Sequence, residues 1–130
     1  MNKPRILIVE DGESQRFLLR GFLVREGYRV GEAENGLQAI ELLRGENFDI
    51  ILLDHRMRGM SGLDVLREVK KRNPEIDVVM VSAYGTTERA VEALEAGAFY
   101  YITKPVDLEK LLILLDRISK RNHPIKEVSS

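Results

Sequence analysis

The 130-residue sequence contains no cysteine. This absence excludes a disulfide framework and any metal site with thiolate ligands, and it agrees with a reducing compartment. No apolar run approaches the ~20 residues that a membrane-spanning helix needs. The net charge is only −1, with 20 basic against 21 acidic residues, so no overall positive field attracts nucleic acid or an anionic membrane. We therefore expect a cytoplasmic domain that binds neither nucleic acid nor a membrane.

Short apolar runs alternate with amphipathic segments along the chain. The runs are compact and mostly rich in β-branched residues, which favours buried strands, whereas the segments between them carry apolar residues at helical spacing. The predicted strands are Arg5–Val9, Tyr28–Ala33, Phe48–Leu53, Ile76–Val81 and Phe99–Ile102. The predicted helices are Ser14–Glu26, Leu37–Arg44, Leu63–Arg72, Thr87–Ala96 and Leu108–Lys120.

Five strands that alternate with five helices predict an α/β fold. Strands buried on both faces and joined by single helices imply a parallel sheet covered on each side, and right-handed crossovers restrict it to a doubly wound sandwich. An antiparallel α+β domain would need hairpin signals, which the sequence lacks. We expect one domain over residues 1–121, followed by a tail or the start of a linker over residues 122–130.

Residues at the ends of the predicted helices support this division. Gly27, Gly45 and Gly97 stand where helix C-caps are expected, because glycine adopts the left-handed conformation that ends many helices. Asp107 stands where the N-cap of the last helix is expected, since its carboxylate can accept from free backbone N–H groups.

Polar side chains follow four of the five predicted strands. Glu10 and Asp11 follow the first strand, Asp54 the third and Ser82 the fourth, and Lys104 comes after the fifth. In an open parallel sheet, ligands bind beyond the carboxyl ends of the strands. We therefore expect these five side chains to converge on one edge of the sheet.

The chemistry of this set indicates a hard cation and a phosphoryl group. Crowded carboxylates repel one another and need a cation, and oxygen ligands without His or Cys favour Mg²⁺, Mn²⁺ or Ca²⁺ over zinc. Mg²⁺ commonly keeps several waters and completes its shell with phosphate. An ionised aspartate beside a metal, a lysine and a hydroxyl suits phosphoryl transfer to a carboxylate oxygen.

At these residues the sequence resembles the CheY-like receiver domain of bacterial two-component response regulators. Four motifs occur in order, ILIVED, IILLDHRMRGMSG, VVMVSAYG and AGAFYYITKP, within a resemblance that covers about residues 4 to 120. The resemblance implies a flavodoxin-like (βα)5 fold with strand order 2-1-3-4-5. The stretch GTTERAVEALEAGAFYYITKPVDLEKL is similar to receivers of nitrogen-regulatory-type transcriptional activators.

The resemblance also implies a function and partners. Such a domain accepts a phosphoryl group from a sensor histidine kinase, or from a small acyl or amido phosphate, and passes the signal to an output domain or downstream effector. It is not an enzyme acting on other substrates, since it catalyses only its own phosphorylation and dephosphorylation.

Matching positions receive individual roles from the resemblance. Asp54 would accept the phosphoryl group and help to bind Mg²⁺. Asp11 would bind Mg²⁺ directly, Glu10 would bind it through water, and the backbone carbonyl of Arg56 would supply a further ligand. This chain has Arg58 where the family usually has proline, which predicts a more basic loop after the third strand.

Three further residues would connect the phosphoryl group to the surface. Lys104 would contact the phosphoryl group, and Pro105 would follow a cis peptide bond. Ser82 would donate a hydrogen bond to a phosphoryl oxygen, and Tyr101 would be the aromatic residue that turns inward. Arg56 and Tyr84 occupy the two positions that tune dephosphorylation in the family.

Each assignment has a simpler alternative. Glu10 and Asp11 can be a solvated turn and helix cap, Ser82 can cap a strand end, and Tyr101 can be a core residue. At the level of function, the alternatives are a binding module that uses the unphosphorylated surface, a flavin-binding domain and an aspartate-dependent phosphatase. The acidic loop after the first strand would repel a cofactor phosphate, and Arg56 stands where such phosphatases usually carry a second carboxylate.

The last predicted helix contains five consecutive apolar residues, Leu111–Leu115. At about 100° per residue they encircle the helix, so a helix packed on one face of a sheet must leave one or two exposed. We expect an exposed apolar patch beside Tyr100, formed with the fourth helix and fifth strand. This patch would serve a partner or a homodimer, unless the tail covers it.

Overall fold

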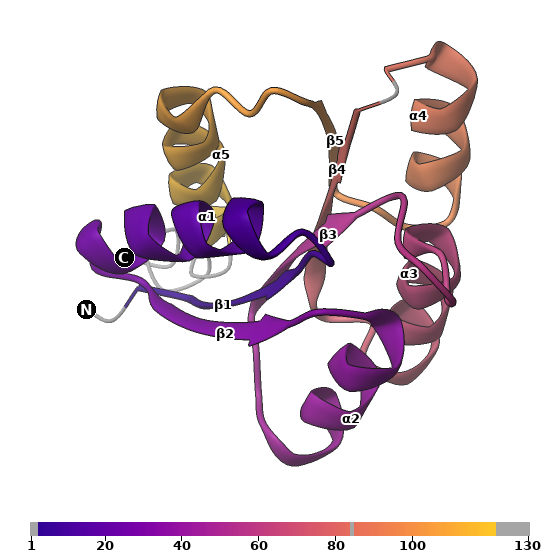
Figure 1. Ribbon diagram of the computed structural model, residues 1–130, viewed down its shortest axis with the longest axis horizontal. Helices are drawn as coiled ribbons and strands as arrows, with labels where there is room; N and C mark the ends of the chain where they lie inside the picture. Colours follow the sequence, from indigo (N-terminus) through magenta and orange to yellow (C-terminus); the bar gives the residue numbers. More distant parts are fainter. Residues whose placement is uncertain (1–2, 84, 122–130) are drawn as a thin grey trace, which may run out of the picture.

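Strands and helices alternate along the chain as predicted (Figure 1). The computed structural model describes residues 3–83 and 85–121, so Tyr84 and the predicted tail over residues 122–130 lie outside the described residues. In chain order the elements are β1 (Arg5–Val9), α1 (Glu13–Arg25), β2 (Arg29–Ala33), α2 (Gly36–Gly45), β3 (Ile50–Asp54), α3 (Gly62–Arg72), β4 (Asp77–Ser82), α4 (Thr87–Glu95), β5 (Tyr100–Thr103) and α5 (Leu108–Arg121).

The five strands form one parallel sheet in the order β2-β1-β3-β4-β5, which confirms the predicted order. Neighbouring parallel strands need a long crossover, and a helix provides each of these crossovers here. The register places Val9 of β1 beside Leu53 of β3, and Asp54 of β3 beside Val81 of β4. Because all strands run in the same direction, their carboxyl ends lie along one edge of the sheet.

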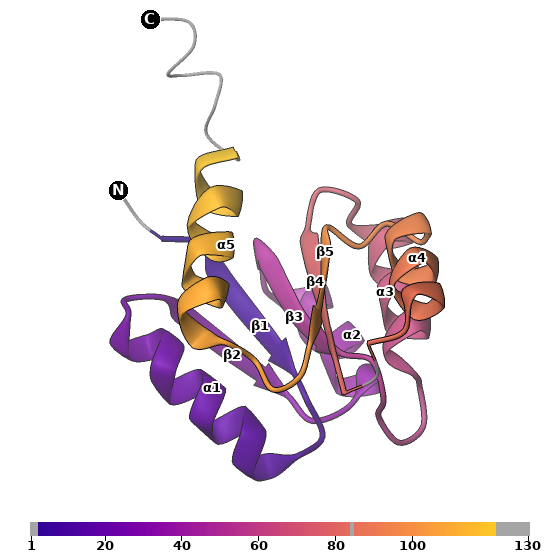
Figure 2. The ribbon, with the colours of Figure 1, turned by 90° about the horizontal axis from the view of Figure 1, so that it is seen from above.

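Helices cover both faces of the sheet (Figures 1 and 2). Helices α1 and α5 pack on one face, while α2, α3 and α4 pack on the other. Successive strand residues alternate between these two apolar clusters: Leu7 and Leu53 join the cluster under α2, α3 and α4, whereas Ile8 and Leu52 join the one under α1 and α5. The strands are therefore apolar at consecutive positions because both of their faces are buried.

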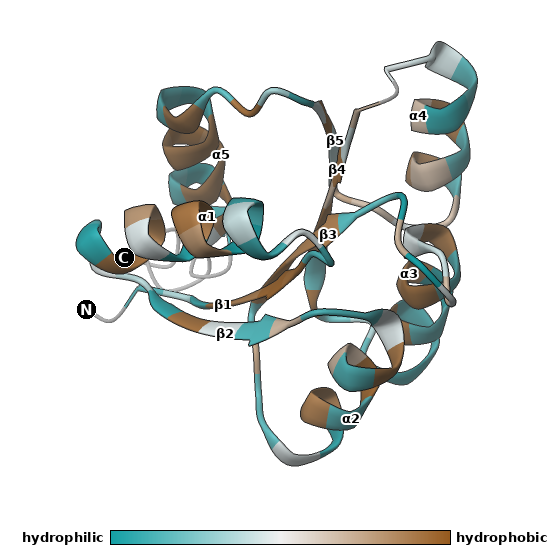
Figure 3. Ribbon diagram, viewed as in Figure 1, coloured by the Kyte–Doolittle hydropathy of each residue, from teal (hydrophilic) through white to brown (hydrophobic). Residues whose placement is uncertain are grey.

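Burial differs between the centre and the edges of the sheet. Every residue of β3 and β4 is buried, whereas β5 has exposed residues at both ends. In Figure 3 most of β1 is apolar, whereas the helices carry both apolar and polar residues along their length. A fully buried leucine or isoleucine stabilises the fold by roughly 1.5 to 3 kcal/mol, so the central strands hold the domain together.

Side chains cap the amino ends of four helices. Asn35, Ser61 and Thr86 accept hydrogen bonds from backbone N–H groups in the first turns of α2, α3 and α4. The predicted cap Asp107 does the same for α5 through its Oδ1 atom, at 3.1 and 3.2 Å. Helix α1 begins after Gly12 with no side-chain cap. Among the helices of the described ranges, none is long and apolar enough to cross a membrane.

Two of the three glycines predicted as helix C-caps have the expected conformation. Gly27 and Gly97 follow α1 and α4 with φ angles of +95° and +109°, which glycine adopts without strain. The prediction for Gly45 is wrong, because Gly45 is the last residue of α2 and lacks a positive φ. The chain leaves α2 through Glu46 in an extended conformation, so no left-handed residue is needed there.

Candidate functional site

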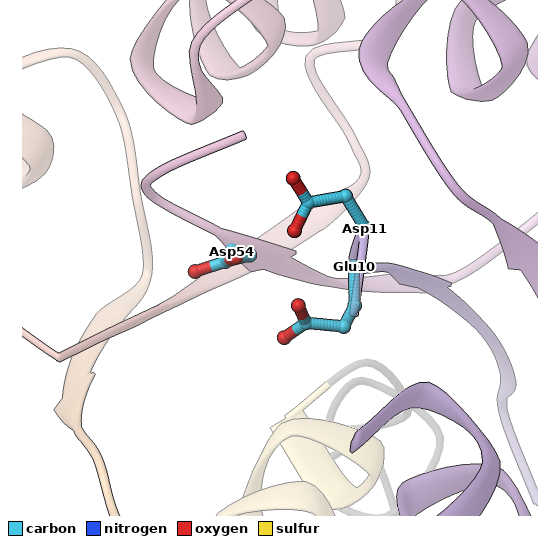
Figure 4. Close-up of side chains that lie close together, drawn as sticks. All are labelled: Glu10, Asp11 and Asp54. Atoms are coloured by element: carbon cyan, nitrogen blue, oxygen red, sulfur yellow. The ribbon is translucent and has the colours of Figure 1, made fainter. Parts of the chain in front are cut away.

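Three carboxylates lie together at the carboxyl ends of β1 and β3 (Figure 4). Glu10 and Asp11 follow β1, and Asp54 is the last residue of β3. Ligand oxygens from the three side chains all lie within 4.8 Å of one another. Glu10 and Asp54 are buried, while Asp11 is more exposed. This acidic cluster has the residues and the spacing to hold one metal ion.

The sheet register brings the cluster together. Since Val9 and Leu53 are neighbours on adjacent parallel strands, the residues that follow them, Glu10 and Asp54, are also brought side by side. The Glu10 carboxylate is then held by its Oε2 atom, which accepts from the backbone N–H of Gly12 at 2.9 Å. A strand pairing fixed by core packing therefore sets the separation of two of the acids.

Burial and repulsion act together on Asp54. Burial is the largest cause that raises the pKa of the Asp54 carboxyl, the negative charge of Glu10 is the second, and together they bring the pKa to about 6. The positive charge of Lys104 and a hydrogen bond from the backbone N–H of Arg56 oppose this rise. A carboxylate kept in such a site is stabilised by any further positive charge, which is the property expected of a cation ligand.

Lys104 reaches the cluster from the loop after β5. Its Nζ atom lies 3.0 Å from Oε1 of Glu10 and 3.5 Å from Oδ1 of Asp54. A third acceptor, Oε1 of Gln15, lies closer to Nζ, at 2.8 Å. Gln15 was not identified from the sequence. Gln15 lies in the first turn of α1, which begins two residues after Asp11, but an exposed polar residue of a helix carries no signal in the sequence that marks it for the site. The peptide bond between Lys104 and Pro105 is cis, as predicted.

The loop after β3 donates two backbone hydrogen bonds to the acidic cluster. Besides the Arg56 N–H, which binds Asp54, the backbone N–H of Arg58 donates to Oδ2 of Asp11 at 3.3 Å. Arg58, the residue that departs from the family pattern, therefore touches the site through its backbone. The role of the Arg56 carbonyl as a metal ligand stays a prediction.

Ser82 lies at the end of β4, beside the strand that ends in Asp54. Ser82 is completely buried. Its backbone carbonyl accepts a hydrogen bond from the backbone N–H of Lys104 at 2.7 Å. This bond continues the ladder between β4 and β5, so the end of β4 and the predicted phosphoryl-binding lysine are joined directly. The predicted contact of the Ser82 hydroxyl with a phosphoryl oxygen stays a prediction.

Tyr101 points inward and Tyr100 outward, as expected for neighbours in a strand. Tyr101 packs against the apolar cluster under α2, α3 and α4, while Tyr100 is 52% exposed. The Tyr101 ring meets the His55 ring edge to face, with centroids 6.0 Å apart. Burial, and next the charge of Arg89, lower the pKa of the His55 imidazole, which favours its neutral form. Tyr101 thus packs on the residue that directly follows Asp54.

A groove of about 370 Å³ opens beside the site. Glu10, Gln15, Asp54 and Lys104 form its polar end. Its walls are mostly apolar and come from α1, from the strands and from the loop that leads into α5, through Leu18, Leu19, Leu52, Pro105, Val106 and Leu108. Asp54 therefore lines a groove whose walls extend beyond the acidic cluster.

The surface of β5 and α5 exposes apolar residues. Ile113 is 56% exposed, and together with Tyr100 it lines a hollow of about 480 Å³ between the two elements. The expected exposed residue within Leu111–Leu115 is therefore Ile113, and it lies beside Tyr100 as predicted. Leu111 and Leu115 are buried against the sheet.

Residues 6–116 match the family model of the response regulator receiver domain. The chain is 46% identical over 110 residues to the transcriptional regulatory protein ZraR of Klebsiella oxytoca. That alignment covers 85% of this chain and 25% of ZraR, so this chain spans about a quarter of the relative's length. The likeness to a transcriptional regulator agrees with the subfamily predicted from the sequence.

Solved structures have the same fold. A CheY-like receiver domain protein from Methanospirillum hungatei is 33% identical, with a TM-score of 0.83 and coverage of 92% of this chain and 99% of that one. NtrX from Brucella abortus is 32% identical, with a TM-score of 0.88 and coverage of 98% and 29%. The motifs, the sheet order and the acidic edge agree with these likenesses, and the chain belongs to the response regulator receiver domain family of two-component systems.

Proposed function

We propose that this chain is a Mg²⁺-dependent phosphoryl-accepting switch in which Asp54 receives the phosphoryl group. The observation that carries the proposal is the approach of Asp54 to Glu10 and Asp11, with oxygens within 4.8 Å, while Lys104 lies 3.5 Å from the Asp54 carboxylate. A nucleophilic carboxylate, a cation site and an ammonium group thereby share one edge of the sheet. These are the components that phosphoryl transfer needs.

The residues around Asp54 fit Mg²⁺. Carboxylate and carbonyl oxygens, without sulfur or imidazole, suit a hard cation. Asp11 and Asp54 would bind it directly, Glu10 through water, and the carbonyl of Arg56 would complete the protein's share. The bound cation would neutralise negative charge on the carboxylates and on the incoming phosphoryl group.

The chemical step forms one bond and breaks one. A carboxylate oxygen of Asp54 attacks phosphorus, and a new P–O bond gives an acyl phosphate. The bond from phosphorus to the donor breaks at the same centre, and its electron pair leaves with the donor's imidazole nitrogen or with the acetate of acetyl phosphate. Lys104 stabilises the charge on the transferring group, and the Ser82 hydroxyl donates to one of its oxygens.

A protein donor fits the surroundings of the site. The groove that leads to Asp54 has apolar walls, and Leu18 on its α1 side is 71% exposed. A small phosphodonor would occupy only the polar end of this groove, whereas a protein would also cover its apolar walls. We infer that the physiological donor is the phosphohistidine of a sensor histidine kinase.

The phosphoryl group would act on the far side of the site through β5. Ser82 and Lys104 would draw the ends of β4 and β5 toward the phosphoryl group, and Tyr101 would follow because it packs on His55. The affected surface is the one formed by α4, β5 and α5, with Tyr100 and Ile113 exposed on it. We propose that this surface contacts an output domain or downstream effector, or a second copy of the chain.

Phosphorylation with a small donor tests the proposal. The protein is incubated with acetyl phosphate, with Mg²⁺ or with excess chelator, and its intact mass is measured. We expect one added phosphate only with Mg²⁺, and none in Asp54→Asn, which keeps the size of the side chain. Equal uptake by Asp54→Asn at the wild-type rate would exclude Asp54 as the acceptor.

A further inference from the structure

The side-chain oxygen closest to the Lys104 ammonium group, among its hydrogen-bond acceptors, does not belong to an acidic residue. Its Nζ atom lies 2.8 Å from Oε1 of Gln15, against 3.0 Å to Glu10 and 3.5 Å to Asp54. The three acceptors come from the first turn of α1, from the residue after β1 and from the end of β3. Gln15 therefore ties the lysine to an element that the phosphoryl chemistry does not otherwise use.

An ammonium group has three N–H donors and no acceptor. Two of these donors meet acceptors that are themselves held in place, because Glu10 is fixed by the Gly12 N–H and Gln15 belongs to a helix. The third donor is left for the side of Asp54, where the phosphoryl oxygens would lie. Resting on the proposed function, we propose that Gln15 is a positioning residue that orients Lys104 toward the phosphoryl group.

The neutrality of the glutamine matters for this role. Three carboxylates already crowd the site, and burial together with Glu10 raises the pKa of Asp54. A fourth carboxylate at the position of Gln15 would hold the ammonium group equally well but would add to the repulsion of an incoming phosphoryl group. An amide oxygen orients the lysine without this cost.

Gly12 leaves room for the Glu10 carboxylate that Lys104 contacts. A Cβ atom placed on Gly12 would come within 3.2 Å of the Glu10 carboxylate and 3.8 Å of the Gln15 amide carbon. The first distance is tight and the second is an ordinary contact, so the turn between β1 and α1 is narrow beside Glu10, and Gln15 lies next to it. Gln15 also lines the groove beside the site, so the same side chain connects Lys104 to the surface of α1.

The test compares three variants with the wild type. Gln15→Met keeps the length of the side chain but removes the acceptor, and Gln15→Glu keeps an acceptor of the same reach. Ser14→Ala is the matched control, since Ser14 is an exposed residue of the same helical turn. The first readout is the side-chain nitrogen resonance of Lys104 in the metal-free protein, assigned with Lys104→Arg. The second is the affinity for beryllofluoride, a phosphoryl mimic, in Mg²⁺.

We expect the Lys104 resonance to shift toward that of a solvated lysine in Gln15→Met and to be retained in Gln15→Glu and Ser14→Ala. Beryllofluoride should bind Gln15→Met about fivefold more weakly, which corresponds to the net contribution of one typical hydrogen bond. A Gln15→Met protein with the wild-type resonance and affinity would overturn the positioning role. Failure of the wild type itself to bind the mimic would instead overturn the proposed function, and the inference with it.

Discussion

Strands β3 and β5 belong to the same sheet but differ in how firmly they are held. All residues of β3 are buried between helices on both faces, and the strand ends in Asp54. The edge strand β5 exposes Tyr100 and Thr103, and Lys104 follows it. The site is therefore divided between two parts of the sheet. The acidic cluster lies at the ends of buried strands, whereas Lys104 and Tyr101 belong to an edge that can move at lower cost in free energy.

A core substitution should show the largest difference between the two strands. Ile51 of β3 is 0% exposed, so Ile51→Ala should lower the free energy of unfolding by about 2 to 5 kcal/mol. Tyr100→Ala in β5 should lower it by less than about 1 kcal/mol, because half of that side chain is already exposed. Urea denaturation measures both. Equal losses would show that the edge strand is held as firmly as the centre.

The acidic cluster should destabilise the domain when no cation is present. The pKa of the Asp54 carboxyl is about 6 in the folded state against an ordinary value of 3.8, so the folded state binds the proton more tightly. The protonated Asp54 carboxyl therefore contributes its full stabilisation of the folded state below about pH 4. This contribution to the free energy of unfolding is lost as the pH rises and is absent above about pH 6. Asp54→Asn should raise the free energy of unfolding at pH 7 by about 1 to 3 kcal/mol.

The control for Asp54→Asn is the same measurement near pH 4, where most of the gain should disappear because the wild-type carboxyl is then protonated in the folded state and partly protonated in the unfolded state. Mg²⁺ at pH 7 should stabilise the wild type more than Asp54→Asn. If the gain at pH 7 and at pH 4 were the same, crowding of charge at the strand ends would not be its cause.

Removal of the lysine should separate the two regions. Lys104 contacts Glu10 and Asp54, and its backbone N–H binds Ser82. The Lys104→Ala variant should therefore still accept a phosphoryl group. On phosphorylation, however, the amide resonances around Ser82 and Tyr101 should shift by less than about half as much as in the wild type, because the contact between Lys104 and the phosphoryl group is gone. Full wild-type changes in the phosphorylated variant would contradict the coupling role.

The smallest effect on stability is expected at the exposed patch. Ile113 is 56% exposed, so Ile113→Glu should change the free energy of unfolding by less than about 0.5 kcal/mol. The same change should abolish self-association in beryllofluoride, because it places a charge in the apolar patch beside Tyr100. Sedimentation of both proteins, with and without the mimic, measures this. A wild type that is monomeric in both states would leave an output domain or effector as the partner.

Most of the fold could be predicted from the pattern of apolar runs, because two-sided burial makes the central strands apolar at every position. The bounds of β1 agree fully, but β3 and β4 were predicted to start and end too early. Asp54 and Ser82 belong to the strands by their pairing, not by their hydropathy. Phe48 precedes β3 and is buried for a different reason, since its ring packs where a side chain on Gly31 would lie.

The acidic residues of the site could be predicted because parallel strands bring their carboxyl ends to one edge. Gln15 could not, since an exposed polar residue on a helix has no distinctive pattern, and its approach to Lys104 depends on where α1 packs. Likewise, the contact between Tyr101 and His55 joins β5 to the residue that follows β3, and these two strands are not neighbours in the sheet. Such contacts depend on the depth of side-chain packing rather than on strand order.

The central claim is that phosphoryl chemistry on the constrained strands is transmitted to the edge strand. Amide spectra of the wild type, recorded before and after addition of beryllofluoride in Mg²⁺, test it most directly. We predict large changes at Asp11 and Asp54 and also at Tyr101 and Ile113, with Asp54→Asn unchanged throughout. Changes confined to the residues around Asp54, with the resonances of β5 and α5 unaltered at saturation, would contradict the account.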